Sequence, residues 1–236
     1  MRSDARYWPT LSTAEAALRP QFELLDRATR AIFDGPDVIQ RVFAPGTRVL
    51  AEGERPGTVE VILDGWAASY KSLRDGRRQI ISFLLPGDLI GMAGLTGHSS
   101  VTIEAITELR LQSAGLISPT MMELYVVLLV QHHRMEELLL SLGQRDAVER
   151  TAALLLDLFD RAAARQMVTA GRLQMPLTQK HLSAALGISA VHANRVMSIL
   201  KRTALVRSAH GRLEVTDRES LARAAQQSAT GAPDPV

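Results

Sequence analysis

The apolar positions between residues 38 and 112 form short runs separated by turn residues. The runs are VEVIL, WAASY, IISFLL, TIEAI and LRLQSA, with Pro-Gly, Asp-Gly or single Gly between them. Asp75-Gly76 lies between two such runs and predicts a β-hairpin. Many short strands with even turn spacing favour a jelly roll (a double-stranded β-helix) over a parallel sheet.

From Ser118 onward the apolar positions recur with a helical period. Ser118 suits the N-cap, and Pro119 suits the first helical position. Beyond them one side of the segment recurs at alternating steps of four and three for about three heptads, the spacing of a coiled-coil seam. The seam positions are Leu124, Leu128, Gln131, Met135, Leu138 and Leu142. The pattern predicts a dimerisation helix over 118–143; a helix packed only on its own domain is the alternative.

After an amphipathic helix over 145–165, the segment from Pro176 to Arg212 predicts two short helices, a tight turn and a hairpin. Thr178 and Ser189 can cap the two helices, and Gly187 can end the first in the left-handed conformation. The apolar face of the second helix consists of Ala193, Val196, Met197 and Leu200, and the opposite face of Val191, Asn194, Arg195 and Ser198. Two apolar strand segments flank Gly211.

Charge changes the interpretation of this segment. Between Gly171 and Arg212 the chain carries seven basic residues and no Asp or Glu in 42 positions. A compact helical unit with charge of one sign is typical of a surface that meets a polyanion. The alternative is a solvated basic face. The pattern favours a winged helix-turn-helix that docks on duplex DNA.

The motif LTQKHLSAALGISAVHANRVMSILKRTALV resembles the DNA-binding domain of the CRP/FNR family of bacterial transcription regulators. The glycine spacing of the predicted roll also resembles the cyclic-nucleotide-binding roll of that family, so the resemblance covers roughly residues 20–222. It implies an α+β protein of three parts. These are a β-roll sensor domain with an N-terminal arm (1–117), a dimerisation helix (118–143) and a winged helix-turn-helix domain with a disordered tail (144–236).

The resemblance implies that the second helix of the motif enters the major groove. The family has an arginine at the place of Arg195, and a guanidinium can bond guanine O6 and N7 together. Where the family often has glutamate, this chain has Val191, which can pack on a thymine methyl but cannot accept a bond from cytosine; the half-site should therefore differ from the common family element. The remaining expected DNA contacts, mostly to phosphates, are Thr178, Lys180, Ser189, His192, Asn194 and Ser198.

The candidate effector pocket is the part of the resemblance where the chain departs from the family pattern. The family binds the cyclic nucleotide through Gly-Glu and a later arginine followed by Ser or Thr. Here Gly87-Asp88 occupies the first part, and Ser99 appears at the arginine's place, with Gly94 and Ser100 nearby. No Lys or Arg occurs from Gln79 to Leu109. A buried phosphate without a cation would keep its desolvation cost, so cyclic AMP binding is not expected.

The composition and the motifs argue against several kinds of cofactor site, against a membrane protein and against an enzyme. The chain of 236 residues has no cysteine, which excludes an iron–sulfur cluster held by thiolates. His98 is the single histidine of the predicted roll and is a poor haem ligand candidate, and adjacent His132 and His133 lack the spacing of a helical metal pair. No signal peptide, membrane span or catalytic motif is visible. We therefore expect a cytoplasmic protein that is not an enzyme, with no cofactor or metal and an unknown effector.

The expected partners are a palindromic double-stranded DNA site, a second copy of the chain and, if the protein is an activator, RNA polymerase. Three alternatives stay open at the level of sequence. The roll could gate DNA binding with an unidentified small ligand. The C-terminal unit of a ligand-binding module could contact a protein instead of DNA. The chain could also package nucleic acid without sequence preference.

Overall fold

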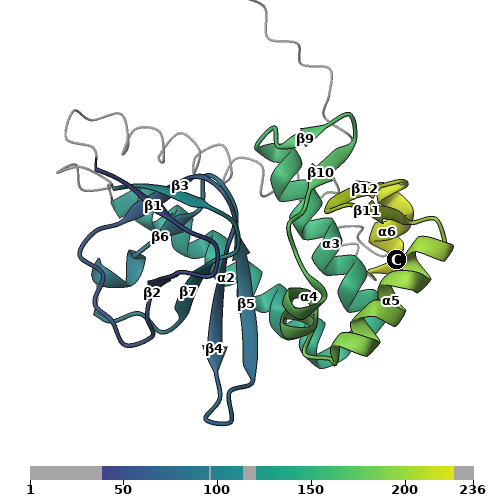
Figure 1. Ribbon diagram of the computed structural model, residues 1–236, viewed down its shortest axis with the longest axis horizontal. Coiled ribbons are helices and arrows are strands. Elements are labelled where there is room, and N and C mark those ends of the chain that lie inside the picture. The colour runs from purple at the N-terminus through teal and green to yellow at the C-terminus, as the bar shows by residue number, and fades with distance from the viewer. Residues whose placement is uncertain (1–38, 96, 114–120, 226–236) are drawn as a thin grey trace, which may run out of the picture.

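The computed structural model describes residues 39–95, 97–113 and 121–225 (Figure 1). A β-roll and a helical domain lie side by side, and the long helix α2 passes behind the roll to join them. The predicted N-terminal arm, the predicted disordered tail and the proposed helix start at Ser118-Pro119 lie outside the described residues. Among the described helices, none is long and apolar enough to cross a bilayer.

The roll consists of two four-stranded antiparallel sheets, with strand orders β1-β8-β3-β6 and β2-β7-β4-β5. Its elements are β1 (Gln40–Phe43), β2 (Arg48–Leu50), β3 (Glu60–Asp64), β4 (Ala67–Ser72), β5 (Arg78–Leu84), β6 (Leu89–Ile90), the 3-10 helix η1 (Met92–Leu95), β7 (Thr102–Ala105) and β8 (Leu109–Ser113). Ile62, Ile103 and Leu111 from both sheets are buried in one cluster between them. The predicted jelly roll is confirmed, because each predicted apolar run supplies one strand.

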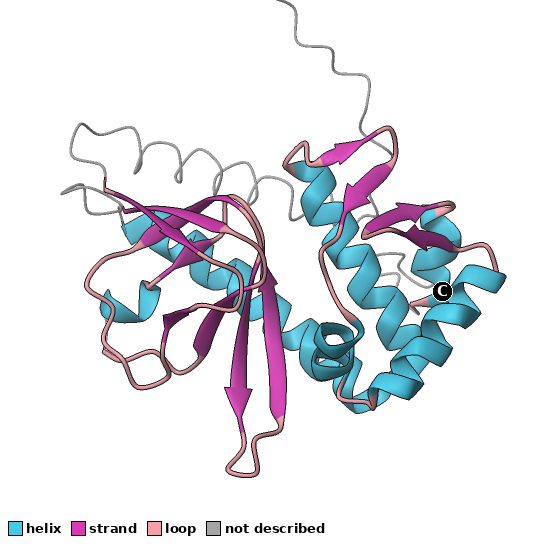
Figure 2. Cartoon of the chain, in the orientation of Figure 1, coloured by secondary structure: helices cyan, strands magenta, loops and turns pink. Residues whose placement is uncertain are grey.

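The β4–β5 hairpin extends well beyond the rest of the roll (Figures 1 and 2). Ser72 pairs with Arg78 at its end, and the Leu73 amide donates to the Arg77 carbonyl at 2.8 Å. Gly76 in the loop has a φ of +85°, a conformation that glycine adopts without the steric cost of a side chain. The Asp75-Gly76 signal therefore located this turn correctly.

Helices α2 (Met121–Gln144) and α3 (Ala147–Ala164) are separated by a short break. Asp146 is the N-cap of α3, and its carboxylate accepts from the amides of Val148 and Glu149. The Glu149 carboxylate accepts in return from the Asp146 amide at 2.8 Å. This capping box satisfies the free amides of the first turn and starts a new helix here.

The helical domain also contains α4 (Gln179–Leu186), α5 (Ala190–Arg202) and α6 (Arg218–Ala224). A four-stranded sheet, in the order β11-β12-β10-β9, packs beside these helices. Its strands are β9 (Val168–Thr169), β10 (Arg172–Gln174), β11 (Val206–Ala209) and β12 (Arg212–Val215). The sequence pattern predicts the β11–β12 hairpin but neither the β9–β10 hairpin nor α6.

One continuous hydrophobic cluster joins the two domains. It contains Trp66, Tyr70 and Phe83 of the roll together with Leu155 of α3 and Leu186 of α4. The contact between β5 and α4 also includes polar groups, since the side-chain amide of Gln79 donates to the Ala185 carbonyl at 2.9 Å. The roll and the helical domain therefore share a core in this structure.

Candidate DNA-binding surface

The α4–turn–α5 unit is built from the caps that the sequence predicted. Gly187 follows α4 at φ 66° and ψ 31°, the left-handed conformation that reverses the chain direction after a helix. Ser189 then caps α5, and its hydroxyl oxygen accepts from the His192 amide at 3.2 Å. Ala193, Val196 and Leu200 of α5 are buried, so the helix has one fixed inner face.

The start of α4 carries an unusual capping box. The Thr178 hydroxyl accepts from the His181 amide at 3.3 Å, and His181 Nδ1 accepts from the Thr178 amide at 3.2 Å. Histidine takes the place that glutamate or glutamine usually holds in this motif. Burial lowers the pKa of His181 below its ordinary value, which favours the neutral ring that can accept this bond.

The last turn of α4 is held by side chains from two other elements. Besides the bond from Gln79 to Ala185, Arg150 of α3 donates to the Leu186 carbonyl at 2.7 Å. Terminal helix carbonyls lack partners within the helix, so these donors satisfy groups that would otherwise be left free. The orientation of α4 is thus linked to both the roll and α3.

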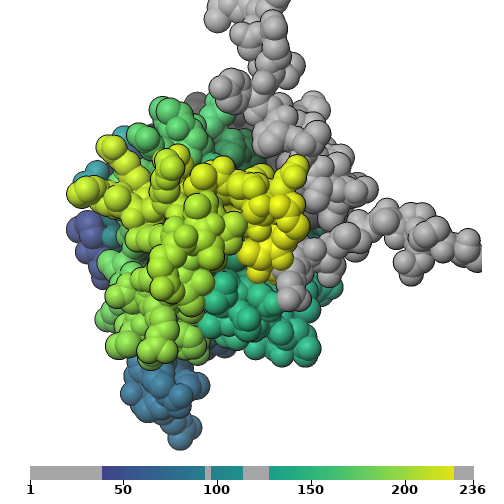
Figure 3. Space-filling view, turned by 90° about the vertical axis from the view of Figure 1, so that its right-hand side faces the viewer, coloured from purple at the N-terminus to yellow at the C-terminus, as the bar shows by residue number. Residues whose placement is uncertain are grey.

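The outer face of α5 is exposed along its length. Val191 is 77% exposed, although burial away from water would be favourable for an apolar side chain. His192, Asn194, Arg195 and Ser198 are also exposed. The Ser198 hydroxyl donates to the Asn194 carbonyl at 2.9 Å. Figure 3 shows the yellow-green residues of α5 spread across the front of the helical domain.

The positive charge around this face is mostly unpaired. Arg172 and Arg207 both approach Glu214, at 3.3 and 3.7 Å. Within the described part of the chain, no carboxylate forms an ion pair with the other five basic residues of the acid-free stretch, which are Lys180, Arg195, Lys201, Arg202 and Arg212. Unpaired cations on one surface attract a polyanion.

The wing is a two-residue hairpin beside α5. Ala209 pairs with Arg212, and the turn residues His210 and Gly211 have φ values of +50° and +71°. Two consecutive positive φ values match the tight turn whose twist fits antiparallel strands. The wing therefore presents Arg212 from a short and well-defined hairpin.

Comparison with known families divides the chain in the same way. The cyclic nucleotide-binding domain family matches residues 40–114, and the Crp-like helix-turn-helix domain family matches residues 149–224. The nitrogen fixation regulation protein FixK of Rhizobium meliloti is 31% identical over 195 residues, which cover 82% of this chain and 89% of FixK. The chain belongs to the CRP/FNR family of transcription regulators.

Other members of the CRP/FNR family agree with this assignment. The transcriptional activator protein FnrL of Cereibacter sphaeroides is 26% identical over 181 residues, 70% of this chain and 71% of FnrL. The structure of FixK2 from Bradyrhizobium japonicum superposes with a TM-score of 0.71 at 24% identity, over 83% of this chain and 99% of FixK2. The FixK2 likeness confirms the predicted fold.

This CRP/FNR chain is a DNA-binding transcription regulator and not an enzyme. The Crp-like match also sets aside the alternative of a C-terminal unit that contacts protein in place of DNA. All eight predicted DNA-contact residues are exposed on the helix-turn-helix unit. Their individual roles stay predictions.

The predicted seam of this CRP/FNR regulator is only partly exposed. Leu128 and Met135 are 56% and 43% exposed, and Gln131 is exposed too. Leu138 and Leu142 are half-buried. A methyl group placed on Gly187 would lie 3.8 Å from Leu142 Cδ2, so Leu142 faces the α4–α5 turn of its own chain. The side chain of Leu124 lies outside the described residues.

Leu139 is an exposed apolar residue of α2 that the predicted seam omitted. It is 65% exposed, more than either Leu128 or Met135. Leu128, Met135 and Leu139 are spaced by seven and four residues, so they share one face of α2. The sequence places Leu139 directly after the seam position Leu138, and the pattern of steps alone chose Leu138 for the seam.

The residues of the predicted effector pocket lie in different turns and loops of this CRP/FNR roll. Gly87 and Asp88 form the turn between β5 and β6, and Gly94 lies in η1. Ser99 is tied to the β2–β3 loop, because its amide donates to the Glu54 carbonyl and its carbonyl accepts from Gly53, both at 2.8 Å. Its hydroxyl donates to the Val101 carbonyl at 2.7 Å. Ser100 is exposed.

Asp88 is buried among cations that sequence analysis did not assign to it. Arg161 Nη2 and Arg165 Nη2 from α3 each bond its carboxylate at 2.7 Å, and Arg134 Nη1 from α2 lies 3.5 Å away. Burial alone would raise the pKa of Asp88, but the three guanidinium groups hold it well below its usual range. No local pattern joins residues that lie so far apart in the chain.

Proposed function

We propose that this regulator binds a two-fold related DNA site as a homodimer, with α5 of each copy in the major groove. The observation that carries the proposal is the exposed outer face of α5, surrounded by basic residues without carboxylate partners in the described structure. A helix of this kind fits the width of the major groove, and paired helix-turn-helix units read half-sites about one helical turn apart.

Base reading is assigned to the middle of this face. Arg195 has an exposed guanidinium and would bond guanine O6 and N7. Val191, one turn earlier, would pack on a thymine methyl. Asn194 would pair with adenine or contact the backbone. This combination predicts a half-site with a required G·C pair and a nearby preference for T.

Phosphate contacts are assigned to the two helix starts. The hydroxyl oxygens of Thr178 and Ser189 accept backbone amides, which leaves each hydroxyl proton for a phosphate oxygen. Lys180 and His192 are exposed close to these caps. Such contacts position the protein on the duplex without reading its sequence.

The exposed apolar row of α2 supports the homodimer. Leu128, Met135 and Leu139 are exposed on one face of α2, where a second α2 would cover them. Two copies related by a two-fold axis would present two α5 helices to one duplex. A contact with RNA polymerase, expected for an activator, stays a prediction.

We further propose that DNA binding does not require cyclic AMP. The segment from Gln79 to Leu109 contains no Lys or Arg, and the Ser99 hydroxyl is already bonded within its own loop. A nucleotide phosphate in that place would lack a charged partner from these residues.

Selection of bound duplexes from a random pool, without added ligand, tests the proposal. The expected result is a two-fold symmetric sequence with half-sites about one helical turn apart. A selection with Arg195→Ala should lose the preference for guanine at one position of each half-site. Equal recovery of scrambled duplexes would favour a packaging protein, and recovery that depends on cyclic AMP would contradict ligand independence.

A further inference from the structure

The junction between the roll, α2 and α3 holds more positive than negative charge. Three guanidinium groups converge on Asp88, whose side chain is 6% exposed. Asp157 also pairs with Arg161 at 3.2 Å, but its side chain is 47% exposed and therefore well solvated. Guanidinium groups stay protonated at every accessible pH, so three positive charges face one buried carboxylate.

The carboxylate of Asp88 has no capacity left for another donor. One oxygen accepts from the Leu85 amide at 2.9 Å and from Arg161 at 2.7 Å. The other oxygen accepts from Arg165 and is approached by Arg134. Arg161 additionally donates to the Phe83 carbonyl at 2.9 Å.

Several donors of the three arginines are nevertheless left over. Arg134 Nη2, Arg161 Nε and Arg165 Nη1 are buried, and no acceptor from the described residues bonds them. A buried donor without an acceptor costs free energy, more so when it is charged. The pKa of Arg134 is lowered by burial first and then by repulsion from Arg161, despite the attraction of Asp88 and Asp157. Burial is thus the main cause of this shift, and repulsion from Arg161 adds to it.

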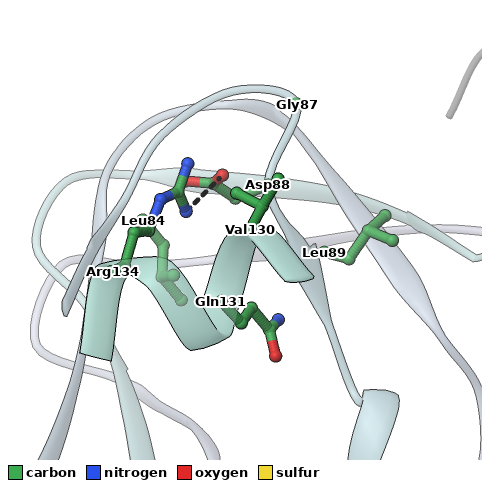
Figure 4. A pocket seen from close by; sticks show the side chains of 7 residues that line it. All are labelled: Leu84, Gly87, Asp88, Leu89, Val130, Gln131 and Arg134. Atoms are coloured by element: carbon green, nitrogen blue, oxygen red, sulfur yellow. Dashed lines mark ion pairs between the residues drawn. The ribbon is translucent and has the colours of Figure 1, made fainter. Parts of the chain in front are cut away.

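A small hollow opens beside Arg134 (Figure 4). Its volume is about 30 Å³, whereas one water needs roughly 10–15 Å³ on this measure. The hollow is lined by Leu84, Gly87, Asp88, Leu89, Val130, Gln131 and Arg134. The hollow has room for about two oxygen atoms, such as those of a carboxylate or two oxygens of a phosphate. It is too small for a nucleotide base or a ribose.

We propose that this junction is a binding site for a small oxyanion, a carboxylate or phosphate group, held by the guanidinium of Arg134 over the turn at Gly87-Asp88. Planar guanidinium groups match the geometry of both anions and form short, charge-assisted hydrogen bonds with them. The anion supplies an acceptor for Arg134 and adds negative charge beside the three arginines. Because it would touch α2 and the roll next to α3, its binding stabilises the packing of the helical domain on the roll.

The test is a calorimetric titration of the full-length protein with inorganic phosphate and, separately, with acetate, at constant ionic strength set by chloride. We expect saturable binding of at least one of them, near one per chain, and a higher midpoint of thermal unfolding. Binding of phosphate alone identifies a phosphate group as the ligand, and binding of acetate identifies a carboxylate. Failure of both to bind at millimolar concentration overturns the proposal.

The variant Arg134→Gln locates the site. It removes one guanidinium from the hollow and should weaken anion binding roughly tenfold or more, because a hydrogen bond between charged groups is lost. Arg77→Gln is the matched control, since the Arg77 side chain is 77% exposed on the β4–β5 hairpin and pairs with the neighbouring Asp75. Equal affinities of Arg134→Gln and the natural protein would contradict the assignment.

A measurement on the natural protein covers the case in which Arg134→Gln does not fold. Crystals soaked in selenate, which has the shape and charge of a doubly charged tetrahedral oxyanion, should show an anomalous selenium peak next to Arg134. Selenium peaks confined to the exposed surface of α4 and α5, or the absence of any peak at Arg134, would refute the site.

Discussion

At the scale of single residues, Arg195 is where the reading of DNA can be tested most directly. Arg195→Ala removes a guanidinium that no carboxylate of the described residues holds, so the folded state should change little. Affinity for the selected operator should fall by ~1–3 kcal/mol, and preference should relax at one base pair. Fluorescence anisotropy with the operator and its point variants measures both effects. Equal losses on operator and random duplex would rule out base reading by Arg195.

Lys180 should act on all DNA sequences alike. Lys180→Ala removes one phosphate contact, so affinity should drop by a similar factor for operator and random duplex. The slope of log affinity against log salt should become shallower by about 1. Lys71→Ala is the control, because Lys71 is an exposed lysine of the roll that pairs with Glu52 at 3.1 Å. An unchanged salt slope in Lys180→Ala would exclude the phosphate contact.

His181 should make stability depend on pH. Its pKa is lowered from 6.5, mainly by burial, although Glu104 opposes the shift. Between the folded value and 6.5, the unfolded chain binds the proton more readily, so the free energy of unfolding rises with pH across that window. Protonation would also remove the acceptor for the Thr178 amide.

The variant His181→Gln keeps an acceptor at this position of the capping box but does not titrate. Urea unfolding at a series of pH values should therefore give a flatter profile below about pH 6.5 for His181→Gln than for the natural protein. Parallel profiles for the two proteins would show that His181 does not contribute to the pH dependence.

At the scale of the element, the exposed row of α2 sets the expected dimer contact. Leu139→Glu places a charge at the residue of this row with the highest exposure, 65%, and should shift the protein to monomers because a buried unpaired charge is costly. His133→Glu, on a different side of the helix, is the control. Analytical ultracentrifugation measures the outcome. A Leu139→Glu protein that remains dimeric would place the interface elsewhere.

The same helix shows what periodicity can and cannot predict. Steps of four and three residues located the helix, and the seam that they assign, including Leu128, Met135 and Leu142, stays a prediction. In the structure Leu142 is half-buried near Gly187 of its own chain, whereas Leu128 and Met135 are exposed. Period alone identifies an apolar row, whereas the choice between adjacent leucines such as Leu138 and Leu139 depends on what packs on each.

Short elements of the helical domain were the hardest to predict. The β9–β10 hairpin turns at Ala170 and Gly171, both with positive φ, yet β9 contains only Val168–Thr169. Two residues are too few to show a strand period. The hairpin β11–β12 was predictable because four-residue strands flank Gly211.

At the scale of the whole molecule, Asp88 links elements that lie apart in the chain. Asp88→Asn would leave the guanidinium groups of Arg161, Arg165 and Arg134 without their buried counter-charge. Breaking a buried ion pair costs about 3–5 kcal/mol, and urea unfolding should show a loss of that size. Asp75→Asn on the exposed hairpin is the control. A loss below ~1 kcal/mol would mean that the cluster adds little to stability.

The sequence by itself determined the order of the domains, the roll, the long helix and the helix-turn-helix, because glycine spacing, helical period, caps and one-signed charge are local properties of the chain. It also determined which face of α5 is exposed. Only the tertiary structure decided that three arginines of α2 and α3 surround Asp88, that Gln79 holds α4, and which apolar residues of α2 stay uncovered. These features depend on contacts between residues distant in the chain, and such contacts leave no periodic signal in the segments that make them.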